Sequence, residues 1–295
     1  MPRLIDPGQG AAIGLEELVA ALDEARFDPR DEDAFAAMGP WLARLGRNPG
    51  FLSDLAIAEL ERRFSGQSAN AYGAQVLLLA HPDGRYALRA NFWPARDDAV
   101  VRAGGTAPFF YDLPHDHNFS FLTVGYMGPG YWSDYYRFDG EPRLPGDAAG
   151  LVFEERARLE PGRVMLYRAH RDVHVQLPPD AFSVSLNILG HDRTQQWRSQ
   201  YRFDIGRDVV AEALTVARSE ALVTLAVALG GAAGAGLAAE MAVRHPAPRM
   251  RMTAIAALDD RRVLEKGCDD PDALVARAAR ARLAILSDPE ASVRR

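Results

Sequence analysis

Two histidines separated by one residue, His115 and His117, are the part of this 295-residue sequence with the clearest chemical potential. In a β-strand, side chains alternate between the two faces, so both imidazoles would project from one face about 7 Å apart. Such a pair can hold a metal ion from one side. Asp116 would point to the opposite face, and we therefore do not expect it to be a ligand.

The residues that follow the histidine pair predict β-structure. Residues 119–126 are rich in aromatic and β-branched side chains, residues 127–130 have the composition of a turn, and residues 131–138 have the composition of a second strand. We interpret this stretch as a β-hairpin with the metal site at its entrance.

Further short strands are predicted on both sides of this stretch, at residues 74–80, 85–93, 151–159, 164–167 and 182–189, with turn residues such as 81–84 between them. Several short strands at this spacing indicate a barrel or a sandwich. Two of the strands alternate polar and apolar residues. In residues 182–189 this predicts one face toward a polar cavity, and in residues 85–93 the polar face either lines a pocket or faces solvent. The residues on those faces are Arg89, Asn91, Trp93, Ser183, Ser185 and Asn187.

Residues 72–207 resemble the cupin family. In the first cupin motif, a His-x-His pair is followed by a glutamate and then by a glycine. Here His115 and His117 match the histidines, Gly128 matches the glycine, and Phe121 stands at the position of the glutamate, which is a metal ligand in many cupins. The resemblance implies a mainly β core of the cupin type, a double-stranded β-helix barrel, with a three-histidine metal site.

The second cupin motif combines a Pro-Gly turn, a histidine and an asparagine. The sequence offers Pro161-Gly162, His174 and Asn187, at a looser spacing than the family pattern. The resemblance implies His174 as the third ligand, with His170 as the alternative. Asp172 also stays open as a ligand, because the segment around it has no readable period.

Three neutral imidazoles suit Fe, Zn, Cu or Ni, and three ligands on one side of an ion leave positions for substrate and oxygen. Similarity to the three-histidine thiol dioxygenases leads us to predict a mononuclear non-haem Fe(II) oxygenase, either a dioxygenase or a hydroxylase. Its substrate would be a carboxylate- or thiol-bearing small molecule or a peptide side chain, together with O2, and use of 2-oxoglutarate stays open. The alternatives are an isomerase or lyase that uses Zn, Mn or Ni, and a non-enzymatic ligand sensor.

Several polar and aromatic residues are candidates for the pocket around the metal. Arg89 and Arg168 can clamp a carboxylate, because the guanidinium fork binds it through two parallel hydrogen bonds. Gln176 and Asn187 can orient a bound cofactor, ligand or water. Tyr126 is expected in the pocket wall, with other aromatic residues of the same stretch that are also candidates for the core: Tyr131, Trp132, Tyr135 and Tyr136.

Helical segments are predicted on both sides of the barrel. Residues 1–71 contain apolar residues at helical spacing in three segments, and residues 208–295 are helical again. In the second region residues 245–258 and 270–283 look alike, and residues 288–294 begin in the same way. They resemble leucine-rich-repeat-variant and HEAT-like repeats, which implies either a surface for a protein or peptide partner or a structural end-piece.

Composition narrows the class of protein. A formal net charge of -6 argues against a nucleic-acid partner, which would call for clustered cations. A single cysteine, Cys268, and an N-terminus without an apolar core predict a cytoplasmic location. Residues 221–239 carry no charge but consist mostly of Ala and Gly, so we predict two short helices joined by a glycine linker and no membrane span.

Overall fold

The computed structural model describes residues 1–68, 70–81 and 84–287, which form two compact units. The first unit comprises Met1–Glu141, Ala148–Arg193 and Gln200–Ala211, and the second comprises Pro142–Asp147, Thr194–Ser199 and the chain from Glu212 onward. Each unit is described by itself. The turn predicted at residues 81–84 lies partly outside the described residues.

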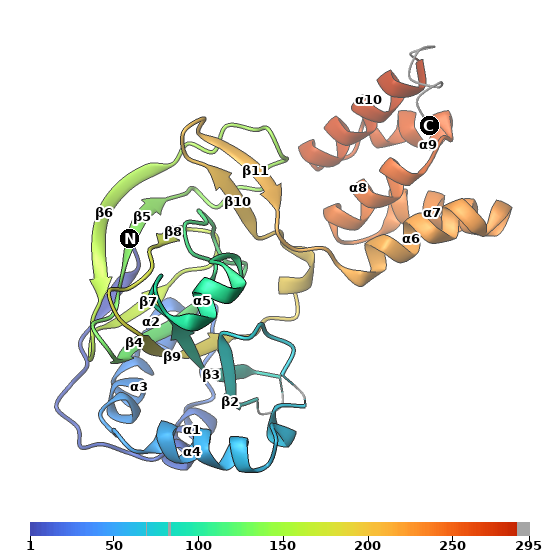
Figure 1. The fold of residues 1–295 in the computed structure, drawn as a ribbon. Coiled ribbons are helices and arrows are strands. Elements are labelled where there is room, and N and C mark those ends of the chain that lie inside the picture. Colours follow the sequence, from blue (N-terminus) through green and yellow to red (C-terminus); the bar gives the residue numbers. More distant parts are fainter. Residues whose placement is uncertain (69, 82–83, 288–295) are drawn as a thin grey trace. The chain divides into compact units, whose positions relative to one another are not determined.

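Two antiparallel sheets form the β core of the first unit (Figure 1). The six-stranded sheet has the order β1-β7-β4-β9-β3-β2, and the three-stranded sheet has the order β6-β5-β8. The strands are β1 (Arg3–Ile5), β2 (Val76–Ala80), β3 (Tyr86–Trp93), β4 (Phe121–Met127), β5 (Tyr131–Arg137), β6 (Val152–Leu159), β7 (Val164–Tyr167), β8 (Asp172–Gln176) and β9 (Ser183–Gly190).

The turn between β4 and β5 carries the chain from one sheet to the other. Gly128 and Gly130 have φ angles of 81° and 77°, and a Cβ on Gly128 would lie 2.3 Å from the carbonyl oxygen of Phe182. The predicted turn is confirmed, but the predicted hairpin is wrong. β4 pairs with β7 and β9, whereas β5 pairs with β6 and β8, because the two glycines let the chain turn a corner between the sheets.

The N-terminal helices cover one face of the six-stranded sheet. They are α1 (Leu15–Ala25), α2 (Glu32–Ala36), α3 (Gly39–Gly46) and α4 (Phe51–Glu61), and α5 (Ala99–Gly104) follows β3. Leu88 and Ile188 share a buried cluster with helical residues such as Leu18, and each such side chain contributes roughly 1.5–3 kcal/mol by its burial. Phe121 points to the other face and belongs to the same buried cluster as Tyr135 of β5.

Strands β3 and β9 carry the predicted polar faces into the space between the sheets. Arg89 lies directly opposite Asn187 in the register of the two strands, and Asn91 lies opposite Ser185. Their apolar neighbours at alternate positions pack toward the helices. The predicted alternation is therefore confirmed, and it places a polar row on the cavity side of the sheet.

A two-stranded ribbon, β10 (Tyr201–Asp204) and β11 (Val209–Ala213), follows the two sheets. The prediction of helix from about Asp208 is wrong for β11. Tyr201, Phe203 and Val210 are buried along the ribbon, so its conformation is set by packing and strand pairing, which local helical propensity does not override.

The second unit contains five helices among the described residues, α6 (Arg218–Leu229), α7 (Gly231–Arg244), α8 (Pro248–Ala257), α9 (Arg261–Gly267) and α10 (Ala273–Ser287). The two helices predicted across residues 221–239 are confirmed as α6 and α7, but the predicted glycine linker is reduced to Gly230, because residues 231–236 form the start of α7. The stretches that look alike contain α8 and α10, and the third, from residue 288, lies outside the described residues. Within the described part of the chain, no helix combines the length and apolarity needed to cross a bilayer.

Candidate metal centre

The three histidines come from two separate places in the first unit. His115 and His117 lie in an irregular segment before β4, and His174 is the central residue of β8. The prediction of a regular strand around the first pair is wrong, since His115 makes only isolated bridges to His174 and Arg202. Pro114 precedes it and has no amide donor with which to continue a ladder. The backbone N–H of His115 donates to the carbonyl of His174 at 3.1 Å, and the backbone N–H of His174 donates to the carbonyl of His115 at 3.0 Å.

The Nε2 atoms of the three histidines converge. His174 Nε2 lies 3.1 Å from His117 Nε2 and 3.2 Å from His115 Nε2, and one ligand atom from each ring lies within 4.8 Å of the others. Metal–imidazole distances of about 2.0–2.1 Å place two nitrogens on one ion about 3.0–3.4 Å apart. The spacing of these atoms therefore fits a single metal ion.

Burial keeps all three rings in a form that can bind a metal, and a hydrogen bond orients the ring of His115. His115 Nδ1 donates to the carbonyl of Leu113 at 2.8 Å, which leaves the lone pair of its Nε2 free. Burial lowers the pKa of all three histidines. The neighbouring rings lower the pKa of His117 and His174 further, since two positive charges would repel one another. The imidazoles are therefore neutral at neutral pH.

These pKa values predict how acid affects the metal-free protein. Between the ordinary histidine value of 6.5 and the lower values of the folded state, the unfolded chain binds protons that the folded chain does not. The free energy of unfolding should therefore fall as the pH drops below about 6.5. Urea denaturation with a chelator present, from about pH 7.5 to about pH 5, measures this loss. The free energy of unfolding of the His174→Ala variant should fall less over this pH range, and an equal fall in both proteins would contradict the prediction.

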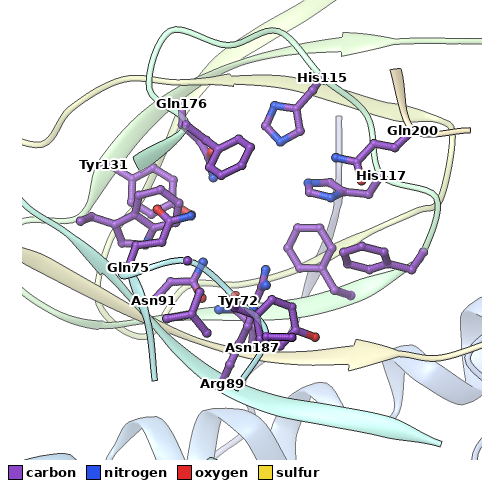
Figure 2. Close-up of a pocket in the computed structure, with 17 residues that line it drawn as sticks. Tyr72, Gln75, Arg89, Asn91, His115, His117, Tyr131, Gln176, Asn187 and Gln200 are labelled. Carbon is purple, nitrogen blue, oxygen red and sulfur yellow. The ribbon is translucent and has the colours of Figure 1, made fainter. Parts of the chain in front are cut away.

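A cavity of about 330 Å³ adjoins the histidines. Figure 2 shows His115 and His117 on one side of it and Arg89, Asn91 and Asn187 across the space from them. It is lined by Ala71, Tyr72, Gly73, Gln75, Val76, Arg89, Asn91, Trp93, Phe110, His115, His117, Phe119, Phe121, Tyr131, Gln176, Asn187 and Gln200. Its volume fits one small molecule, at the lower end of the range for ligand pockets.

The cavity wall opposite the histidines is polar and incompletely hydrogen-bonded. Among the described residues, Arg89 Nε and Asn187 Nδ2 are buried donors without a partner, and Gln75 Oε1 and Asn91 Oδ1 are buried acceptors without one. Burial lowers the pKa of Arg89 to about 10, and none of the described residues lining the cavity is acidic. Unpaired buried groups of this kind are costly unless a ligand or water satisfies them.

Of the side chains predicted around the site, four line the cavity, namely Arg89, Tyr131, Gln176 and Asn187, whereas Tyr126, Trp132, Tyr135, Tyr136 and Arg168 lie outside its lining. Phe121 stands beside the His117 ring, with centroids 4.8 Å apart. Tyr126 is absent from the lining. Its hydroxyl donates to the carbonyls of residues 48 and 49 on the helical side of the sheet, because alternation along β4 turns it away from the cavity.

Arg168 also lies outside the cavity lining. It forms a two-pronged ion pair with Asp172, at 2.9 and 2.7 Å, and donates to the carbonyl of Met1. Both partners are therefore held in a structural interaction. His170, the alternative third ligand, pairs with Asp116 at 3.2 Å and is absent from the histidine cluster.

Sequence reasoning missed several residues of the cavity. Asn91 was assigned to a polar face but not to the site, although its place two residues from Arg89 on β3 could have indicated it. Gln75 and Gln200 line the cavity from positions outside the strands, and Phe110 from the end of a short helical turn with a φ of 58°. No periodicity of the sequence indicates these three.

No protein-family model matches the sequence, and no curated protein matches it. Among solved structures, the chain is similar to the DMSP lyase DddQ from Ruegeria pomeroyi DSS-3, at 16% identity and a TM-score of 0.26 over 65% of this chain and 78% of that one. It is also similar to a Pseudomonas putida prolyl-4-hydroxylase, at 13% identity and a TM-score of 0.24 over 63% and 87% of the two chains. A Phytophthora capsici prolyl 4-hydroxylase matches at 14% identity and a TM-score of 0.25 over 92% and 83%.

Proposed function

We propose that this protein is a mononuclear metal-dependent oxygenase that acts on a small carboxylate. The observation that carries the proposal is the convergence of three neutral Nε2 atoms, from His115, His117 and His174, at a cavity whose opposite wall presents Arg89. Fe(II) is the metal we assign, with Zn, Mn or Ni as alternatives that the same donors accept. When bound, Fe(II) would supply open positions for the substrate and the reducing equivalent for O2 activation.

We further propose that the β core is a cupin-type barrel. The turn between β4 and β5 and the passages from β6 to β7, β7 to β8 and β8 to β9 each carry the chain between the two sheets. Sheets linked in this way enclose a space lined by alternate residues of each strand. The polar row of β3 and β9 and the central histidine of β8 border that space.

The other cavity residues would hold and orient the substrate. Arg89 Nε and Asn187 Nδ2 offer two donors to one carboxylate. The Arg89 charge, which lies 5.0 Å from the Tyr72 ring centroid, gains an anionic partner that the described lining residues do not supply. Burial raises the pKa of Tyr131, so its hydroxyl stays protonated and can donate a hydrogen bond. Phe119 and Phe121, beside the His117 ring, limit the access of water to the histidines.

The cavity favours a reaction in which the carboxylate of the substrate, and not that of 2-oxoglutarate, binds to Arg89. Arg89 is the one arginine among the described lining residues, so 2-oxoglutarate and a carboxylate substrate would compete for it. A cavity of about 330 Å³ also leaves little room for both molecules. The oxygen-consumption test also includes 2-oxoglutarate, to detect a 2-oxoglutarate-dependent reaction on a substrate without a carboxylate.

Oxygen consumption tests the proposed reaction. Protein purified without metal and loaded anaerobically with Fe(II) should consume O2 with at least one member of a panel of small amino, hydroxy and mercapto carboxylates. The Zn(II)-loaded protein should consume none, because Zn(II) has no accessible redox chemistry. Wild-type protein that binds no stoichiometric metal would overturn the metal centre. Turnover that needs 2-oxoglutarate would overturn the assignment of Arg89 to the substrate.

A redox-neutral isomerase or lyase is the second candidate, and Tyr131 is the observation that favours it. Tyr131 lines the cavity, its hydroxyl stays protonated because burial raises the pKa, and that hydroxyl could deliver a proton to a substrate held at Arg89. Such an enzyme would form product under argon, with Zn(II) or Mn(II) as well as Fe(II). Mass spectrometry of the panel after anaerobic incubation therefore separates the two candidates.

A further inference from the structure

We propose that His170 and Asp116 form a buried clamp that positions the segment bearing His115 and His117 for metal binding. The inference rests on the proposed metal centre and assigns His170 a positioning role in place of a ligand role. It follows from three contacts between the segment and its surroundings.

The first contact joins the two side chains. His170 Nδ1 lies 3.2 Å from Asp116 Oδ2, and their residues are 4% and 0% exposed. A carboxylate oxygen accepts, so Nδ1 of the imidazole is the donor in this contact. Asp116 lies between the two histidines in the chain, so a contact that fixes its side chain restricts the backbone on both sides of it.

The second and third contacts fix the same segment through the backbone. The other carboxylate oxygen of Asp116 accepts from the backbone N–H of Tyr201 at 2.5 Å, and Asp116 N donates to the carbonyl of Tyr201 at 3.2 Å. On the opposite side, His170 N donates to the carbonyl of His117 at 2.8 Å. The segment is thus held from β10 and from the loop before β8.

The backbone of His170 adopts an unusual conformation that accompanies the contact of its ring with Asp116. Its φ of 60° lies in the left-handed region, which costs most residues about 1 kcal/mol and is tolerated best by Gly and Asn. The residue accepts that conformation while its ring is buried against Asp116. Its Nε2 has no protein partner, so the Nδ1 contact is the one hydrogen bond of the ring among the described residues.

Loss of the clamp should weaken metal binding more than it weakens the fold. Without it, the irregular segment would sample other conformations in the metal-free protein, and the ion would have to order it on binding. Hydrogen-bond partners that orient a metal site typically account for about 10–100-fold in affinity.

Two substitutions at one position separate the hydrogen bond from backbone strain. His170→Gly removes the donor and His170→Asn places an amide nitrogen near the position of Nδ1, and both accept the positive φ. Zn(II) affinity would be measured by competition with a chromogenic chelator, beside the melting temperature of each metal-free protein. His191→Ala is the matched control, because this ring contacts His81 and does not line the cavity.

The Gly variant should bind Zn(II) about 10–100-fold more weakly than wild type, while the Asn variant and the control stay close to wild type. Wild-type affinity in the Gly variant, or an equal loss in the Gly and Asn variants, would overturn the clamp. If the Gly variant does not fold, His170→Gln takes its place, since its amide nitrogen follows the position of Nε2 and misses Asp116. Failure of the wild-type protein to bind Zn(II) would instead refute the metal centre.

Discussion

Replacing His174 with alanine is expected to remove nearly all bound metal. The change deletes one of three converging Nε2 atoms. The other two belong to His115 and His117, and β8 then contributes no ligand. Loss of one of three ligands should lower the affinity on the order of a hundredfold or more. Metal content per chain after dialysis, measured by mass spectrometry, gives the result, and O2 consumption should disappear with it.

Controls distinguish this effect from unfolding and from adventitious metal. His191→Ala removes a histidine outside the cavity and should retain the wild-type metal content. Circular dichroism of metal-free His174→Ala should match wild type apart from a modest loss of stability, because a buried ring leaves a small void. A His174→Ala protein with one metal ion per chain would show that the histidine cluster is not the binding site.

Replacing Arg89 with methionine is expected to weaken substrate binding and to stabilise the metal-free protein. The substitution removes a charged partner for the carboxylate, which is worth about 1.5–3 kcal/mol, or roughly 10–150-fold in affinity. It also removes a partly buried charge that has no anionic partner among the cavity residues, and burial lowers the pKa of this charge to about 10. We therefore expect the free energy of unfolding to rise by about 1 kcal/mol.

Steady-state kinetics and urea denaturation of Arg89→Met measure the two effects. Arg85→Met is the matched control from the position just before β3, since Arg85 pairs with Asp23 at 2.6 Å on a solvent-exposed surface. Its stability should change by less than about 1 kcal/mol and its kinetics should not change. The amide analogue of the carboxylate substrate should bind equally to wild type and Arg89→Met. Equal losses for acid and amide would contradict the carboxylate assignment.

Strand alternation let the sequence predict one wall of the cavity. The polar positions of β3 and β9 follow a period of two, so Arg89 and Asn187 could each be assigned to the polar face of its strand before the partner strands were known. The same rule places Tyr126 on the helical side, but its application depends on knowing which face of β4 is interior. An apolar strand such as β4, which is buried on both faces, gives no such indication.

The other wall depends on contacts between distant parts of the chain. His115 owes its position to bridges with His174 and Arg202, and Arg168 is taken up by Asp172 within its own loop. Neither pairing leaves a periodic signal in the sequence. The third ligand was predicted from the family resemblance, because the residues around His174 do not by themselves separate it from His170.

The distance along the chain between His115 and His174 has a consequence for the lifetime of the folded protein. The two histidines are 59 positions apart in sequence, yet each donates a backbone hydrogen bond to the other. An ion shared by their rings would act as a reversible cross-link that closes this long loop. Its ligands meet only once β8 and the segment before β4 have come together, so it would form late in folding. We therefore expect bound metal to slow unfolding while leaving the rate of folding nearly unchanged.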